Sequence, residues 1–324
     1  MAFLHIITDN ILPLLVFVAL GYGMDRKFHL DVQSLTKLTF YVVLPAFIFY
    51  SIYCAKIDMA LVNVFLLCCI QMAILAVVGV VIGRLRGYTP GMTEAFKNGT
   101  MFSNNGNIGI ALIALVFTNA PYGSHGNAPY LAEALAVSTM TLVQMNLCLN
   151  TIGLYQAGKG RLSASDAIRV IFRMPVIYTL LAVFVIKYIG FDMRPTIVWP
   201  LLENCAGALV AIVMMALGMQ IHRSRIIFGD VDAWIACFVR LVIAPALSWC
   251  LITLWNLFGT GFSSIASQTI LIMSSVPAAV NSVLYAVEFH NCEDFSTEVV
   301  MMSTFASGIT LACTIYLARI LFPI

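Results

Sequence analysis

A run of hydroxyl, amide and glycine residues interrupts an otherwise apolar segment near residues 92–117. Its polar side chains are Ser103, Asn104, Asn105 and Asn107. A buried amide without a hydrogen-bond partner costs roughly 1 to 3 kcal/mol, and the segment is long enough to cross a bilayer. We therefore expect these side chains to line a polar cavity that binds a substrate or an ion.

A second interruption follows at residues 274–282 and contains Ser275, Pro277 and Asn281. Two broken spans in matching halves of a chain are typical of secondary transporters, whose binding site lies between them near the middle of the bilayer. The pair therefore predicts a crossover at which the polar side chains of both segments meet. The residues that we expect to shape this crossover are Gly106, Gly109 and Pro277.

Unwinding at mid-depth would divide each of these spans into two half-helices. A helix N-terminus carries about half a positive charge and stabilises an anion by roughly 0.3 to 2 kcal/mol. An anion could thus be attracted without a buried lysine or arginine. The carbonyl ends of the half-helices, together with the amide oxygens of Asn104, Asn105 and Asn281, could instead bind a cation such as sodium.

Other polar residues lie inside expected spans. Gln71, Gln144 and Asn146 stand at mid-span, where neutral amides suit a substrate or ion cavity but also form hydrogen bonds between helices; both interpretations stay open. Arg240 is the most deeply placed cation, and it either extends toward the cytoplasmic face or binds an anion. No carboxylate occupies a clear mid-span position, so a proton relay is not indicated.

The composition indicates a membrane protein. Of the 324 residues 61% are apolar and 10% are charged, whereas soluble domains contain about 25% charged residues. Windows of about 17 to 25 mostly apolar residues predict an all-α integral membrane protein with ten transmembrane helices. The expected spans are roughly residues 6–23, 33–53, 59–83, 92–118, 130–156, 168–190, 196–221, 231–257, 263–288 and 295–321. The net charge is only +2, and the absence of a basic cluster gives no indication of a nucleic-acid partner.

The ten spans divide evenly between residues 1–157 and 165–324. Because each half has an odd number of spans, the second half enters the membrane from the opposite side, which gives an inverted repeat. Basic residues follow the first, third, fifth and seventh spans, and by the positive-inside rule those loops are cytoplasmic. They are Arg26, Lys27, Arg84, Arg86, Lys159, Arg161, Arg223 and Arg225. We therefore expect a multi-pass protein of the cell membrane with both termini outside the cytoplasm.

Enzymatic chemistry is not indicated. The histidines lie in termini or loops without the spacing of a zinc site, and most of the nine cysteines fall in apolar runs, where they are expected to act as small reduced hydrophobic residues. The sequence offers no arrangement of nucleophile, metal ligands or acid and base. We expect no metal site and no cofactor other than sodium as a coupling ion.

Three motifs resemble the auxin efflux carrier family, which includes plant auxin carriers and bacterial malate and malonate permeases. They are residues 43–47 (VLPAF), 105–110 (NGNIGI) and 276–281 (VPAAVN), and the resemblance covers essentially the whole chain. It implies two inverted five-helix repeats whose broken helices 4 and 9 cross, as in sodium/bile acid symporters and sodium/proton antiporters. It also implies a scaffold domain of helices 1, 2, 6 and 7, a transport domain of helices 3–5 and 8–10, and a homodimer.

Two features distinguish this chain within the family pattern. Ala111 stands where the family often has a proline after the first break, and the central loop at residues 157–167 is short, which favours a bacterial type. The sequence thus predicts a secondary transporter of small organic anions, mono- or dicarboxylates or auxin-like acids, that works by an elevator mechanism. Sodium coupling, proton coupling and uniport all stay open, and the alternative function is a membrane sensor that retains the transporter fold.

Overall fold

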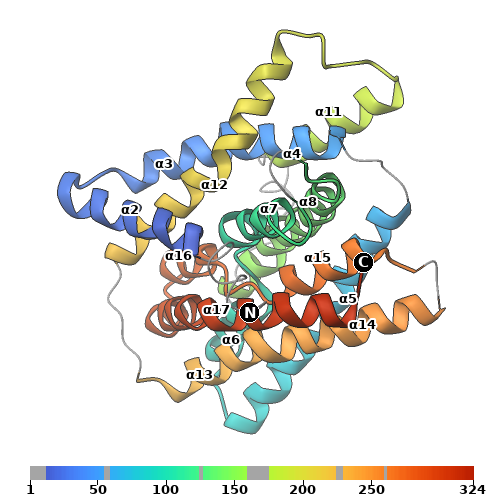
Figure 1. The fold of residues 1–324 in the computed structure, drawn as a ribbon. Coiled ribbons are helices and arrows are strands. Elements are labelled where there is room, and N and C mark those ends of the chain that lie inside the picture. Colours follow the sequence, from blue (N-terminus) through green and yellow to red (C-terminus); the bar gives the residue numbers. More distant parts are fainter. Residues whose placement is uncertain (1–11, 55–58, 124–126, 159–174, 224–228, 259–260) are drawn as a thin grey trace.

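The computed structural model describes residues 12–54, 59–123, 127–158, 175–223, 229–258 and 261–324, and within these ranges its regular elements are all helical (Figure 1). The helices of the first half are α2 (Leu12–Phe28), α3 (Val32–Leu38), α4 (Leu44–Cys54), α5 (Met59–Arg86), α6 (Pro90–Met101), α7 (Ile110–Thr118), α8 (Leu131–Cys148) and α9 (Leu154–Ala157). Those of the second half are α11 (Pro175–Tyr188), α12 (Val198–Arg223), α13 (Val231–Phe238), α14 (Ala244–Phe258), α15 (Ser264–Ser274), α16 (Val280–Glu288) and α17 (Glu293–Leu321).

Five uninterrupted helical stretches among the described residues are long and apolar enough to cross a membrane. They are Ala60–Arg86, Leu131–Ala157, Val198–Arg223, Val231–Phe258 and Glu293–Leu321. The prediction of an all-helical, multi-pass membrane protein is therefore confirmed. The start of the first expected span and of the sixth lies outside the described residues, and the ten-helix inverted repeat stays a prediction.

Four π-helical turns occur among these helices: η2 (Thr39–Val43), η3 (Asn105–Gly109), η4 (Leu149–Gly153) and η5 (Val239–Ile243). Both η2 and η5 come two residues before a proline, Pro45 and Pro245. A proline inside a helix lacks an N–H donor and its ring clashes with the carbonyl four residues earlier, and a wider turn separates the two groups. Such turns are frequent at functional sites, and each of the four contributes at least one residue to the two cavities described below.

Helices α2 and α12 pack with their backbones in direct contact. A Cβ atom on Gly218 would lie 1.9 Å from the carbonyl oxygen of Val18, and one on Gly21 would lie 2.0 Å from that of Met215. Glycine is therefore required at both positions for this approach. Figure 1 shows α2, α3, α4, α11 and α12 together on one side of the molecule, and α12 also contacts α4.

An ion pair closes one end of the α2–α12 contact. The Arg223 guanidinium donates to both carboxylate oxygens of Asp25, at 2.7 and 3.0 Å, and His222 Nδ1 lies 2.7 Å from Asp25 Oδ2. These bonds from Arg223 and His222 hold the pKa of Asp25 well below its ordinary value of 3.8. The carboxylate is 1% exposed, whereas the Arg223 side chain is 46% exposed, so the two helices are joined at this end by a buried carboxylate and a half-exposed guanidinium.

The remaining helices, α5 to α9 and α13 to α17, form the larger part of the molecule (Figure 1). Their interior is a core of buried aliphatic side chains in which Ile110, Leu112 and Ile272 are fully buried. Polar residues interrupt this core where α6 meets α7 and where α15 meets α16. The fold thus places the two sequence interruptions inside a packed interior.

Candidate functional site

The two interrupted spans cross at their breaks. α6 ends at Met101 and α15 ends at Ser274, and the chain between these half-helices and their successors is not helical, with extended backbone at Phe102 and Ala279. Ser103 and Ala278 form an isolated antiparallel bridge, in which Asn104 N donates to Pro277 O at 2.8 Å and Ala279 N donates to Phe102 O at 3.0 Å. We call this junction, residues 102–104 with 276–279, the crossover.

The extended residues are fewer than the sequence suggested. Asn105–Gly109 is not unwound but forms the π-helical turn η3, and Asn281 lies in the first turn of α16. The bridge needs only a short extended segment on each side, and beyond it the intrahelical hydrogen bonds resume. Ala278 N, which the break leaves without a helical partner, donates to Ser303 Oγ at 3.1 Å, so α17 stabilises the crossover from behind.

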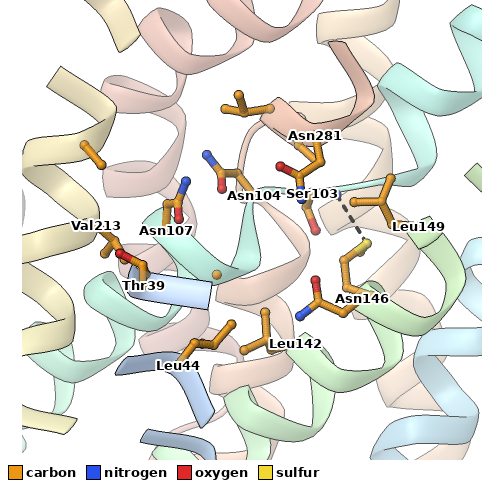
Figure 2. Close-up of a pocket in the computed structure, with 15 residues that line it drawn as sticks. Thr39, Leu44, Ser103, Asn104, Asn107, Leu142, Asn146, Leu149, Val213 and Asn281 are labelled. Atoms are coloured by element: carbon orange, nitrogen blue, oxygen red, sulfur yellow. Dashed lines mark hydrogen bonds between the residues drawn. The ribbon is translucent and has the colours of Figure 1, made fainter. Parts of the chain in front are cut away.

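A pocket opens on one side of the crossover, which we call the amide pocket (Figure 2). Its volume is about 80 Å³. Figure 2 shows Asn104, Asn107 and Asn281 on the crossover side, with Thr39 and Val213 on the facing wall. The lining residues are Thr39, Leu44, Ser103, Asn104, Gly106, Asn107, Leu142, Met145, Asn146, Leu149, Val213, Ala216, Ala279, Val280 and Asn281.

Two amide donors in this pocket have no hydrogen-bond partner among the residues that the structure describes. Asn104 is 6% exposed and Asn146 is 7% exposed, and the Nδ2 atom of each is buried without a partner among the described residues. A buried donor that is left without a hydrogen-bond partner costs about 1 to 3 kcal/mol. A ligand that accepts hydrogen bonds would remove this cost.

The second half-helices both begin at the amide pocket. η3 leads into α7 from Asn105, α16 starts at Val280, and residues of both first turns line the pocket. The first N–H groups of a helix lack intrahelical partners, and the helix dipole adds a partial positive charge there. No carboxylate lies among the described residues that line this pocket. Its electrostatics therefore favour an anion.

Arg240 lies on the opposite side of the crossover, where the first half-helices end. It is 2% exposed, and its guanidinium donates to Thr100 O at 3.1 Å, to Val276 O at 3.1 Å and to Ser274 O. The interpretation that Arg240 extends to the cytoplasmic face is therefore wrong, because its side chain is almost fully buried. Arg240 does not line the amide pocket, and the alternative that it binds an anion stays a prediction. The π-helical turn η5, which contains it, points the side chain inward.

A second cavity of about 30 Å³ lies beside this arginine, and we call it the guanidinium cavity. Asn105, Gln71 and Gln144 line it, and none of the three lines the amide pocket. Gln71 Nε2 donates to Ala244 O at 2.9 Å, and Asn105 Oδ1 accepts from Ser103 Oγ at 2.8 Å. Ser103 and Met145 line both cavities, so the crossover backbone separates them.

The expected site residues are thus divided. Ser103, Asn104, Asn107, Asn146 and Asn281 line the amide pocket. Ser275 lines neither cavity, because its hydroxyl donates to Ile272 O at 2.7 Å within its own helix end.

The glycines of the first break have different surroundings. A Cβ on Gly109 would lie 2.9 Å from the sulfur of Met273, whereas one on Gly106 would meet Leu142 at an ordinary 3.5 Å. Close packing of η3 against α15 therefore depends on Gly109. The structure shows no steric need for glycine at Gly106.

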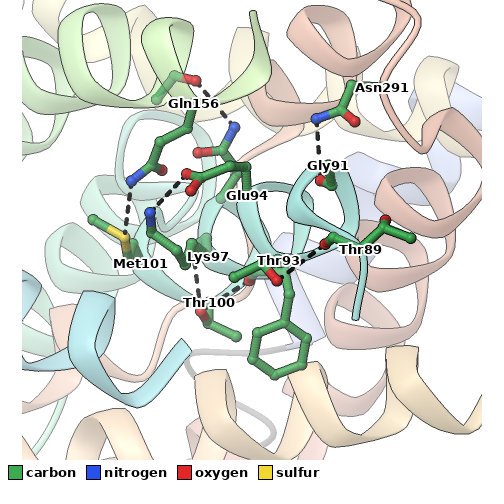
Figure 3. A network of polar contacts seen from close by, with 12 residues as sticks. Thr89, Gly91, Thr93, Glu94, Lys97, Thr100, Met101, Gln156 and Asn291 are labelled. Carbon is green, nitrogen blue, oxygen red and sulfur yellow. Dashed lines mark hydrogen bonds and ion pairs between the residues drawn. The ribbon is translucent and has the colours of Figure 1, made fainter. Parts of the chain in front are cut away.

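Half-helix α6 is held at its start by a polar network (Figure 3). Thr89 Oγ1 accepts from Met92 N at 3.2 Å, which caps the helix, and Pro90 occupies its first position, as the missing N–H allows. Glu94 and Lys97 form an ion pair of 2.6 Å one turn later. Asn291 Nδ2 donates to Gly91 O at 3.3 Å and ties this start to the connection after α16.

Several site residues were not foreseen from the sequence. Leu44, Val213 and Ala216 line the amide pocket from the α4 and α12 side, but aliphatic residues in an apolar span carry no signal of a site. Thr39 could have been suspected, because it precedes the proline that shifts the helix into a π-helical turn. Ser303 is one of several hydroxyls in α17, and only the packing shows which of them meets the crossover.

No family model matches the sequence. The chain is 25% identical over 315 residues to an uncharacterized transporter of Methanothermobacter thermautotrophicus, with 94% of this chain and 96% of that protein covered. It is 24% identical over 287 residues to an uncharacterized transporter of Methanocaldococcus jannaschii, with 84% and 86% covered. The similarity therefore extends over nearly the whole length of these archaeal proteins.

Proposed function

We propose that this protein is a secondary transporter that binds a small organic anion in the amide pocket and carries it across the membrane. The observation that carries the proposal is that the buried Nδ2 atoms of Asn104 and Asn146, beside two half-helix N-termini, have no partner within the described part of the chain. An ionised carboxylate accepts hydrogen bonds and donates none, so it suits such a set of donors. Both relatives are described as transporters, which agrees with this class.

The substrate class follows from the two kinds of lining. The amide groups recognise a carboxylate, while Leu142, Leu149 and Val280 present apolar surface to the rest of the ligand. Mono- and dicarboxylates, including auxin-like acids, are the candidates. Specific hydrogen bonds fix the orientation of such a ligand, and the apolar contacts add affinity.

An elevator movement is part of the proposal. α2, α3, α4, α11 and α12 serve as the scaffold, because the glycine contact between α2 and α12 leaves little freedom within that unit. The ligand lies between this unit and the crossover, since Leu44, Val213 and Ala216 face the asparagines across the pocket. An apolar groove of about 360 Å³ between α2, α12, α7 and α17 opens to the surface at Leu15 and Phe305 and reduces the contact between the two units, which favours sliding.

The inverted ten-helix repeat, the location in the cell membrane with both termini outside the cytoplasm, and the homodimer remain predictions within this proposal. The crossing of α6–α7 with α15–α16 supports the repeat, because these pairs occupy equivalent places in the two halves. Cysteine accessibility from either side of the membrane would test the topology. Size measurement in detergent would test the dimer.

Flux measurement tests the function directly. The purified protein is reconstituted into liposomes and assayed with a panel of radiolabelled mono- and dicarboxylates. We expect uptake or efflux of at least one of them, and a loss of about tenfold or more in Asn104→Ala and Asn146→Ala, since a hydrogen bond to a charged group contributes about 1.5 to 3 kcal/mol.

A matched control is Asn256→Ala, which removes an exposed amide at the end of α14. Equal transport by all four proteins would refute the site. Saturable binding of a carboxylate without flux would instead favour the sensor function.

A further inference from the structure

Arg240 stands out among the charged residues of the molecule. Within the described residues, Asp25 and Arg240 are the charged side chains that are almost fully buried, at 1% and 2% exposure. Asp25 is ion-paired with Arg223. Arg240 contacts backbone carbonyl oxygens, and no carboxylate of the described residues lies within ion-pair distance of it. A buried charge of this kind is costly and commonly functional.

The oxygens that Arg240 binds belong to the ends of both first half-helices. Thr100 lies in the last turn of α6, and Ser274 is the last residue of α15. Each helix C-terminus carries about half a negative charge, so the two together present about one negative charge. A single guanidinium balances them.

In transporters with broken helices, unwound carbonyls and half-helix C-terminal ends are the groups that coordinate a mobile sodium ion or proton. Here the same groups already accept hydrogen bonds from a side chain of the chain itself. The five N–H donors of a guanidinium lie in a rigid planar fork, which lets Arg240 bridge oxygens from two helices at once. A sodium ion at this position would have to displace it.

The other side of the crossover, at the amide pocket, has the opposite partial charge. The N-terminal ends at Asn105 and Val280 together present about one positive charge, and the lining residues of the amide pocket include no charged side chain. One monovalent anion would balance this side. The second charge of a dianion would have no counter-charge in the pocket.

We propose that Arg240 is a built-in counter-cation that takes the place of a mobile coupling cation at the crossover, so that the loaded carrier binds one monovalent anion and no sodium ion. This inference rests on the proposed transport function for its substrate part. Its structural part is that a cation is required between the carbonyl ends of the two half-helices. This requirement affects the stability of the protein and can be measured without a transport assay.

The transport experiment compares the wild type with Arg240→Ala in liposomes. For the wild type we expect less than a twofold change when choline replaces sodium, and a monocarboxylate should be preferred over the dicarboxylate of matched length by tenfold or more. Arg240→Ala should lose at least tenfold in flux, and millimolar guanidinium should restore part of it by filling the vacated position. Arg86→Ala is the control, because it removes an exposed guanidinium that is paired with Asp232, and guanidinium should not change its flux.

The second measurement is the thermal unfolding midpoint in detergent. Arg240→Ala should unfold at a lower temperature than the wild type, and guanidinium should raise its midpoint while leaving the wild type and Arg86→Ala unaffected. If Arg240→Ala does not fold at all, Arg240→Lys and Arg240→Gln decide: the lysine variant keeps the charge and should exceed the glutamine variant in stability and flux.

The outcomes separate the two proposals. Absence of flux for every anion in the wild type would refute the transport function, while guanidinium rescue of the unfolding midpoint would still support the counter-cation. Sodium-dependent flux in the wild type would refute the inference about Arg240. So would an Arg240→Ala variant as active and stable as the wild type, an Arg240→Ala variant that folds but shows no rescue by guanidinium, or a glutamine variant equal to the lysine variant.

Discussion

The α2–α12 contact and the crossover are built on opposite principles. At the first, Gly21 and Gly218 bring two backbones together, and Asp25 ends the contact in bonds to Arg223. At the second, two helices are broken, two cavities remain, and amide donors of Asn104 and Asn146 lack partners. The α2–α12 contact is close-packed and its buried carboxylate is hydrogen-bonded, whereas at the crossover buried amide donors of the described residues have no hydrogen-bond partner.

The difference indicates which part of the molecule serves as support and which as binding site. Protein interiors are packed like organic crystals, so a region that retains unpaired donors and a cavity must gain its missing contacts from something else. Substitutions in the α2–α12 contact should therefore affect stability first. Substitutions in the amide pocket should affect binding first, and the four predictions below test that division.

The largest effect is expected at the glycines. Gly218→Ala would place a Cβ 1.9 Å from Val18 O, and because backbone cannot yield as a side chain does, we expect a loss of about 3 kcal/mol or more in the free energy of unfolding. Gly207→Ala is the control in the same helix, since its Cβ would meet nothing within 4 Å and should stabilise by about 0.5 to 1 kcal/mol. Unfolding in detergent measures both, and equal stability of the two variants would contradict the close contact.

A negative charge added to the amide pocket should have the next largest effect. Asn146→Asp converts an amide donor into an acceptor with a negative charge, and like charges at close range cost several kcal/mol. We expect transport of a carboxylate to fall by about a hundredfold while the unfolding midpoint changes little. Asn256→Asp gives the same change of net charge at an exposed position, and it should transport normally; a similar loss in both variants would point to a nonspecific effect of charge.

The two sides of the crossover can be separated by truncation. Asn281→Ala removes an amide from the lining of the amide pocket, whereas Asn105→Ala removes one from the guanidinium cavity. We expect Asn281→Ala to raise the concentration for half-maximal transport about tenfold and Asn105→Ala to raise it about threefold or less. A larger effect of Asn105→Ala would mean that the anion contacts the other cavity.

The smallest effect concerns pH. Because the folded-state pKa of Asp25 lies below its ordinary 3.8, its ion pair stabilises the protein fully above that value, and this contribution is lost as the pH falls from 3.8 toward the folded-state pKa. Asp25→Asn should therefore lower the unfolding midpoint by a constant amount from about pH 5 to 8. The gap to the wild type should narrow below about pH 4, and a gap that widens there would contradict the assigned direction.

Local sequence signals predicted much of the fold. Apolar windows indicated the helices, and the glycine, proline and amide residues at 102–110 and 274–282 located both breaks, because unwinding is a property of a few adjacent residues. The same signals overestimated how far the chain unwinds, since Asn105–Gly109 is the π-helical turn η3. Whether a short polar segment forms an α-helical or a π-helical turn depends on the helices that pack against it.

The sequence by itself thus determined that this chain is an all-helical membrane protein with two polar interruptions. Only the tertiary structure decided that Asn104 and Asn105, adjacent in the chain, face different cavities, and that Arg240 meets carbonyls more than a hundred residues earlier in the chain. The physical reason is that side-chain direction at a bend, and the partner of a buried charge, depend on elements distant in sequence. Hydropathy describes the preference of a side chain for water or for an apolar environment. The cavity that an asparagine faces and the hydrogen-bond partners of Arg240 depend instead on which residues pack around them.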